Sequence, residues 1–122
     1  MKKKKADPEA LLPLTPAVFH ILLALADGEC HGYGVMQEVE RRSRGKVRLG
    51  PGTLYGSIKR LLHEDLIEES KARPDPEMDD ERRRYYRLTE FGQRVLVAEA
   101  ERLDNLVSHA RAKSILPNPK IA

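Results

Sequence analysis

The stretch that most constrains the fold of this 122-residue chain is residues 50–70, which read GPGTLYGSIKRLLHEDLIEES. Gly50 can take the N-cap position, and Pro51 suits the first helical turn, where a missing N–H costs nothing. Four apolar side chains then recur at helical spacing and would form one buried stripe: Leu54, Ile58, Leu61 and Leu62. The residues outside this stripe include Tyr55, Lys59 and Arg60. The pattern predicts a helix over 51–63 that carries an aromatic ring and two cations away from its core-facing side.

Two shorter helices are predicted before this one. Thr15 is a suitable N-cap and Pro16 a suitable first residue for a helix that ends near 27–28. Its apolar residues follow at helical spacing: Val18, Ile21, Leu22 and Leu25. The next helix begins near His31 and directs Val35, Met36 and Val39 inward, before it ends in the segment 41–45. The N-terminal residues 1–13, with four lysines and two prolines, are predicted to be a disordered tail.

A hairpin and a long helix are predicted after residue 65. The segments 66–72 and 82–88 are typical of paired strands, and the acidic, proline-containing stretch 73–81 would connect them. Thr89 can cap a helix that continues to about Lys113 and would be roughly 37 Å long at about 1.5 Å per residue. Apolar residues follow a heptad seam along it, which predicts a partner chain: Leu96, Ala100, Leu103, Val107 and Ala110.

This order of elements is that of a winged helix-turn-helix, a mainly α fold with a small β-hairpin. The predicted organisation is a basic tail (1–13), a winged helix-turn-helix domain (14–88), a dimerisation helix (89–113) and a frayed tail (114–122). Charge is distributed unevenly along it. Residues 41–60 carry seven basic residues and no acidic one, 61–81 carry nine acidic and two basic, and 82–94 are basic again. The basic segments either form one positive face that binds a polyanion or are separate solvated surfaces.

Enzyme chemistry has little support in the sequence. The four histidines are scattered without a carboxylate or histidine at metal-binding spacing, so no metal site or cofactor is expected. The single cysteine, Cys30, cannot form an intramolecular disulfide and is expected to be a small buried residue. No apolar run reaches the roughly 18 residues that a membrane span needs. A cytoplasmic protein is therefore expected.

Three segments resemble the PadR-like transcriptional regulators in their short form. They are HGYGVMQEV (31–39), GPGTLYGSIKRLLHEDLIEES (50–70) and RRYYRLTEFGQRVL (83–96), and the similarity extends over about 14–106. The chain departs from the family pattern at Gly50, where a serine cap is common, and at Asp65, where glycine is usual. Aspartate tolerates the left-handed conformation that this turn needs. The predicted wing tip 73–81 is acidic, which moves the expected wing contacts to the base of the hairpin.

The resemblance implies a DNA-binding function in which the 51–63 helix enters the major groove. The expected DNA contacts are Tyr33, Thr53, Tyr55, Ser57, Lys59, Arg60, Arg83 and Arg84. Two tyrosines have alternative roles: the Tyr55 ring can be half-buried core, and Tyr33 can pack the first two helices together. Of Tyr85 and Tyr86, which alternate on a strand, one is expected in the core and the other is expected to be exposed or near the dimer seam. Residues 2–5 can be a DNA-tracking arm or a solvated tail.

The resemblance implies a homodimer that binds double-stranded DNA at a palindromic operator. Its role would be that of a repressor that occludes a promoter. A small-molecule effector of unknown identity would release it. The alternative is a winged-helix module that binds another protein and no DNA. The operator sequence and the regulated gene do not follow from the sequence.

Overall fold

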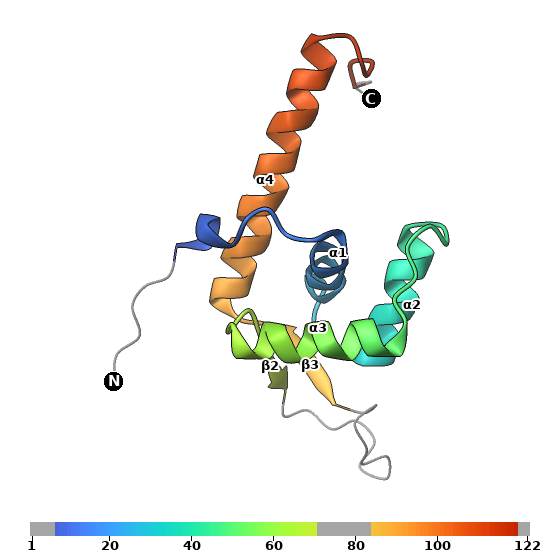
Figure 1. The fold of residues 1–122 in the computed structure, drawn as a ribbon, viewed down its shortest axis with the longest axis vertical. Coiled ribbons are helices and arrows are strands. Elements are labelled where there is room, and N and C mark those ends of the chain that lie inside the picture. Colours follow the sequence, from blue (N-terminus) through green and yellow to red (C-terminus); the bar gives the residue numbers. More distant parts are fainter. Residues whose placement is uncertain (1–6, 71–83, 120–122) are drawn as a thin grey trace.

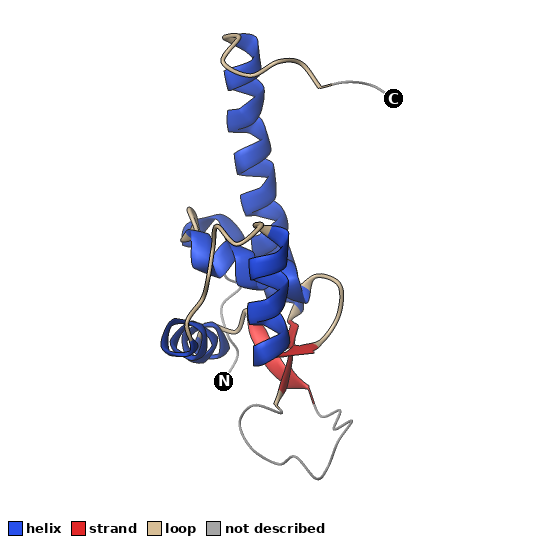
Figure 2. Cartoon of the chain, turned by 90° about the vertical axis from the view of Figure 1, so that its right-hand side faces the viewer, coloured by secondary structure: helices blue, strands red, loops and turns tan. Residues whose placement is uncertain are grey.

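The structure is a computed structural model that describes residues 7–70 and 84–119 (Figure 1). Helices dominate, and a small antiparallel sheet lies beside α3 (Figures 1 and 2). This arrangement confirms the predicted class, a mainly α winged helix with one long final helix. In chain order the elements are η1 (Pro8–Leu11), α1 (Pro16–Leu25), β1 (Cys30–His31), α2 (Gly32–Arg42), α3 (Pro51–His63), β2 (Ile67–Ser70), β3 (Tyr85–Leu88) and α4 (Glu90–Ala112).

The helices begin where the capping residues predict. Thr15 Oγ1 accepts from the Val18 N–H (3.2 Å), and Thr89 Oγ1 accepts from the Gly92 N–H (2.9 Å). Gly50 occupies the N-cap of α3 without a side-chain hydrogen bond. The predicted apolar stripes of α1 and α3 enter one core, with only Leu62 left half-buried. That core is formed by Val18, Ile21, Leu22, Ala24, Leu25, Val35, Val39, Leu49, Leu54, Ile58, Leu61, Leu66, Ile67, Tyr86, Val95 and Leu96.

The sheet has three strands in the order β1-β3-β2, one more than the predicted hairpin. β2 and β3 pair antiparallel, with Ile67 opposite Leu88 and Ser70 opposite Tyr85. The additional strand, β1, is two residues long, too short to show a strand periodicity in the sequence. Tyr86 is buried, which confirms that one of the two tyrosines is in the core, whereas Tyr85 is half-buried and lies against the His31 ring. The predicted loop 73–81 and the adjoining strand ends lie outside the described residues.

The N-terminal segment differs from the predicted disordered tail. Residues 1–6 lie outside the described residues, but η1 forms and packs against α4. Asp7 caps η1 by accepting from the Glu9 N–H (3.0 Å). Behind it the buried Glu99 Oε2 accepts from the Leu14 N–H at 3.0 Å, across 85 positions of sequence. This anchor comes from α4, and local composition near residue 10 therefore gave no sign of it.

The first part of α4 packs on the domain, and the rest extends away from it (Figures 1 and 2). Leu96, predicted as a seam residue for a partner chain, is 5% exposed inside the subunit's own core, so this residue is not available to a partner. The tail also differs from the predicted frayed end. Ser114 adopts a left-handed conformation (φ 63°), the Ile115 N–H donates to the Ala110 carbonyl (2.9 Å), and Arg111 donates to the Pro117 carbonyl (3.1 Å).

Among the described helices, none combines the length and the apolar character that a membrane crossing requires.

Gly92 is required where α4 passes the end of α3. A Cβ at this position would lie 2.8 Å from the Leu66 carbonyl carbon and closer still to its oxygen, and backbone cannot yield as a side chain can. We expect Gly92→Ala to lower the free energy of unfolding by about 2–3 kcal/mol, measured by urea denaturation. Gly52→Ala, at a helical glycine with no neighbour within 4 Å, is the matched control and should not destabilise. Equal stability of the two variants would contradict the packing described here.

Glu99 makes stability depend on pH. Hydrogen bonds from Arg102 (2.6 and 3.0 Å) hold the pKa of Glu99 below its ordinary value, against the opposing effect of burial. A carboxyl whose pKa is lowered by folding stabilises above its unfolded pKa, about 4.3, and loses that contribution as the pH falls through the folded value.

Glu99→Gln should therefore be less stable than the wild type by about 1–3 kcal/mol at pH 7, because the charged hydrogen bonds are lost. The difference should shrink below about pH 4, in urea titrations repeated across pH. Glu101→Gln, on the exposed side of the same helix, is the control. A difference that stays constant down to pH 2 would show that the Glu99 charge does not contribute.

Candidate nucleic-acid interface

The candidate site is the side of α3 that faces away from the core. Leu54, Ile58 and Leu61 are at most 3% exposed and hold the helix against the domain. Their burial fixes which residues remain outside, because side chains three and four positions apart share a face. The outward residues are Gly52, Thr53, Gly56, Lys59, Arg60 and His63, all of them exposed. An exposed helix face that carries cations and no carboxylate suits an anionic partner.

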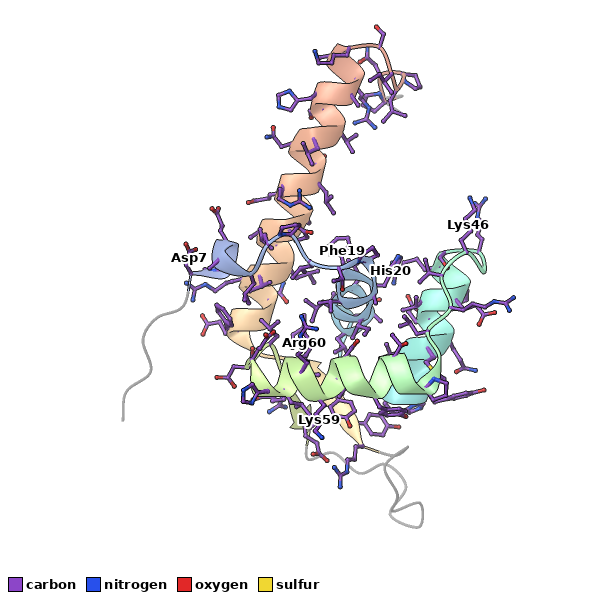
Figure 3. All side chains as sticks on the ribbon, viewed as in Figure 1. Asp7, Phe19, His20, Lys46, Lys59 and Arg60 are labelled. Atoms are coloured by element: carbon purple, nitrogen blue, oxygen red, sulfur yellow. The ribbon has the colours of Figure 1, made fainter. Side chains whose placement is uncertain are left out.

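Lys59 and Arg60 diverge to the two flanks of the outward face of α3, with Arg60 above the helix and Lys59 below it in the view of Figure 3. Neither forms an ion pair within the part of the chain that the structure describes. Arg60 and Ser57 line a hollow of about 90 Å³ beneath the segment that joins η1 to α1, together with Pro13 and Thr15. The two predicted contacts Ser57 and Arg60 therefore lie on the flank toward the N-terminal segment, and Lys59 lies on the other.

Tyr55 lies at the junction of α3 with α2. The side chain is half-buried, and a Cβ added to Gly32 would come within 2.6 Å of the Tyr55 hydroxyl and 2.9 Å of two ring carbons. The ring therefore packs over Gly32, the first residue of α2. Because Gly32 has no side chain, α2 and α3 can approach closely at this point. This placement supports the alternative interpretation of Tyr55 as half-buried core.

His31, Tyr33 and Tyr85 form an aromatic cluster at the start of α2. His31 caps the helix, its Nδ1 accepting from the Gly34 N–H (2.9 Å). Its ring stacks with Tyr33 (centroids 6.5 Å apart, 13° between planes) and meets Tyr85 edge-on (5.2 Å, 89°). Tyr33 is 53% exposed, so it does not pack α1 against α2. Sequence reasoning missed this cluster because the β1–β3 pairing, with His31 opposite Tyr85, assembles it.

Much of the remaining positive charge is paired with carboxylates. Arg41 and Arg42 both bond Glu38, and Arg48 lies 3.6 Å from Glu40. Arginines at the base of the wing, near and on β3, are also paired with carboxylates of β2.

Arg84 lies 3.7 Å from Glu69, and Arg87 donates to Glu68 at 2.8 Å. Arg83, the other predicted wing contact, lies outside the described residues. These pairs are solvent-exposed and contribute little to stability, so another anion can replace the carboxylate. Lys59 and Arg60 can bind an anion without first releasing a carboxylate, because neither forms an ion pair among the described residues.

Cys30 shows no sign of activation as a nucleophile. It is half-buried, and desolvation raises the pKa of the Cys30 thiol, with a smaller contribution from the charge of Glu38. Within the described ranges no three histidine, cysteine or acidic side chains converge as metal ligands would.

The helix pair α2–α3, the paired strands β2 and β3 that follow it and the exposed face of α3 define a winged helix-turn-helix protein. The chain belongs to the transcriptional regulator PadR-like family, whose family model matches residues 21–98. The resemblance inferred from the three sequence segments is thereby confirmed. The predicted class, a regulator rather than an enzyme, is confirmed at the level of the family.

Two curated relatives match about 70% of this chain. Transcriptional regulator Rv3488 of Mycobacterium tuberculosis is 35% identical over 88 residues, which cover 71% of this chain and 75% of that protein. A 37.1 kDa protein in transposon TN4556 of Streptomyces fradiae is 38% identical over 86 residues, 70% of this chain, and the chain spans only 22% of its length.

A solved structure shows the same fold. A PadR family transcription regulator from Clostridium difficile R20291 superimposes with a TM-score of 0.62 at 23% identity, covering 81% of this chain and 97% of the other.

Proposed function

We propose that this chain is a sequence-specific double-stranded DNA-binding regulator that acts as a homodimer, in the cytoplasm, and represses transcription by covering a palindromic operator. The observation that carries the proposal is the exposed face of α3. It is held rigidly by the core, it presents cations with no internal ion pair among the described residues, and it follows α2 in helix-turn-helix order.

In this arrangement α3 enters the major groove with its N-terminal half foremost. Thr53 is exposed in the first turn, where it can reach base edges or phosphate. The N–H groups that begin α3 are left without a side-chain cap at Gly50, and such groups favour an anion. Lys59 supplies charge toward the phosphates on its side, and Arg60 on the other flank can pair with guanine or phosphate.

The start of α2 supplies the second set of contacts. Tyr33 is exposed, and its ring is stacked on the helix cap, so its hydroxyl is presented from a fixed position. We assign it a hydrogen bond to a phosphate, which fixes the register of the protein without reading sequence. Arg84 adds a contact to the DNA backbone once its guanidinium exchanges the Glu69 carboxylate for a phosphate.

The homodimer is supported by the part of α4 that extends beyond the domain. Leu103, Val107 and Ala110 are only partly covered there, and with the exposed Ala100 they follow the predicted seam, now without Leu96. Leu106, which is 52% exposed, lies beside that seam. Pairing of two such helices would cover the apolar side chains and place two α3 helices about 34–36 Å apart, one turn of DNA.

Repression and release both follow from this geometry in the proposal. A bound dimer blocks the promoter, and an effector of unknown identity that changes the angle between the two α4 helices would move the α3 helices out of register. The Leu14–Glu99 hydrogen bond supports this coupling, because it ties α4 to the segment that leads into α1.

Selection from a random duplex pool tests the function. The wild type should enrich a palindrome with half-sites about one turn apart. Lys59→Gln should weaken binding to that duplex and to unrelated DNA alike and should lower the slope of log affinity against log salt by about 1, because one phosphate contact is lost.

Lys113→Gln, which removes a lysine just beyond α4, is the matched control and should leave both quantities unchanged. If the wild type enriches no sequence above salt-sensitive background, the regulator function is contradicted in favour of a protein-binding module.

Leu106→Glu tests the dimer. A carboxylate beside the apolar seam would be desolvated on pairing, so the variant should be monomeric by sedimentation equilibrium at concentrations where the wild type is dimeric. Operator affinity should fall at least about tenfold, since a monomer occupies a single half-site. Ser108→Glu adds the same charge on the other side of α4 and should remain dimeric. A dimeric Leu106→Glu variant would place the interface elsewhere.

A further inference from the structure

We propose that Gly56 is a position where the absence of a side chain allows α3 to approach the base pairs closely, so that Gly56 determines operator specificity. The inference deepens the proposed function and rests on it. It concerns a glycine that the fold itself does not require.

Three other helical glycines of this chain have visible structural reasons, whereas Gly52, in the first turn of α3, has open space as Gly56 does. Gly92 lies against the Leu66 backbone, Gly32 lies under the Tyr55 ring, and a Cβ on Gly34 would come within 2.6 Å of Cys30 Sγ. At each of these positions a methyl group would collide with the protein. These three glycines are therefore explained by packing inside the subunit.

Gly56 has no such reason. It is the sixth residue of the thirteen in α3, and nothing lies within 4 Å of a Cβ built there. Its φ is not in the left-handed region that favours glycine. Glycine is, after proline, the residue that helix interiors tolerate least, and alanine is the best. The free subunit would thus be more stable with alanine at position 56.

The location of Gly56 indicates which partner needs the space. Its neighbours on the helix surface, three and four positions away, are Gly52, Thr53, Lys59 and Arg60. Gly56 therefore lies at the centre of the face proposed to contact DNA. An α-helix with its side chains is about 10–12 Å across and the major groove is about 12 Å wide, so the helix depth in the groove is limited by the side chains at the centre of its face.

The absence of a side chain at position 56 allows α3 to lie deeper in the major groove. With no Cβ at the centre, the helix can descend until Thr53 and the stems of Lys59 and Arg60 reach base edges and flanking phosphates together. A methyl group would hold the helix away and lengthen those contacts. Because non-specific binding uses phosphates and no base edges, it would be affected much less.

The experiment compares Gly56→Ala and Gly56→Leu with the wild type, using the palindromic duplex that the wild type selects and an unrelated duplex of equal length. Both variants should melt at a higher temperature, by about 4 °C for alanine, since both residues are better helix formers than glycine. Affinity for the selected duplex should fall about tenfold or more for alanine and further for leucine. Affinity for the unrelated duplex should change by less than about threefold.

Ser108→Ala is the matched control. It replaces an exposed helical residue by alanine on α4, away from α3, and should leave both DNA affinities unchanged. If the wild type selects a duplex and Gly56→Ala binds it equally well, the inference is overturned while the proposed function stands. If Gly56→Ala does not raise the melting temperature, the fold does need the glycine and the inference is again overturned. A wild type that selects no duplex overturns both.

Discussion

The burial of one side of α3 is the constraint on which the rest of the structure depends. Leu54, Ile58 and Leu61 fix the rotation of this helix in the core, and the opposite face is then fixed as well. Because interiors are close-packed, α3 cannot turn to bury Lys59 or expose Leu54 without creating voids. The presentation of Thr53, Gly56 and the two cations is thus a consequence of core packing, and it exists before any partner binds.

The second determinant is the connection between this domain and α4. Gly92 brings the start of α4 against the end of α3, and Glu99 holds the segment before α1 through the Leu14 N–H. Both contacts join elements distant in sequence. They fix the direction in which the free part of α4 leaves the domain. In a dimer this direction would determine the separation of the two α3 helices, so local contacts at the base of α4 bear directly on which operators fit.

The sequence predicted the elements whose signals are local. Thr15, Gly50 and Thr89 marked the starts of helices, and the stripe through Leu54, Ile58 and Leu61 identified the buried side of α3 correctly. Contacts between distant residues were missed: the strand β1, the cluster around His31 and the η1–α4 packing. Residue type alone also could not predict which tyrosine would be buried and which exposed. Tyr55 lies over Gly32 and is half-buried, whereas Tyr33 is exposed. The difference arises from where each ring lies relative to α2, since both residues are equally aromatic.

The central claim is that two copies of α3 read successive major grooves of one duplex. Methylation of guanine N7, which lies in the major groove, tests it most directly on the selected operator. The account predicts two clusters of guanines at which methylation blocks binding, with centres about 10 base pairs apart and related by the symmetry of the site. A single cluster, or binding that is indifferent to N7 methylation throughout, would contradict it.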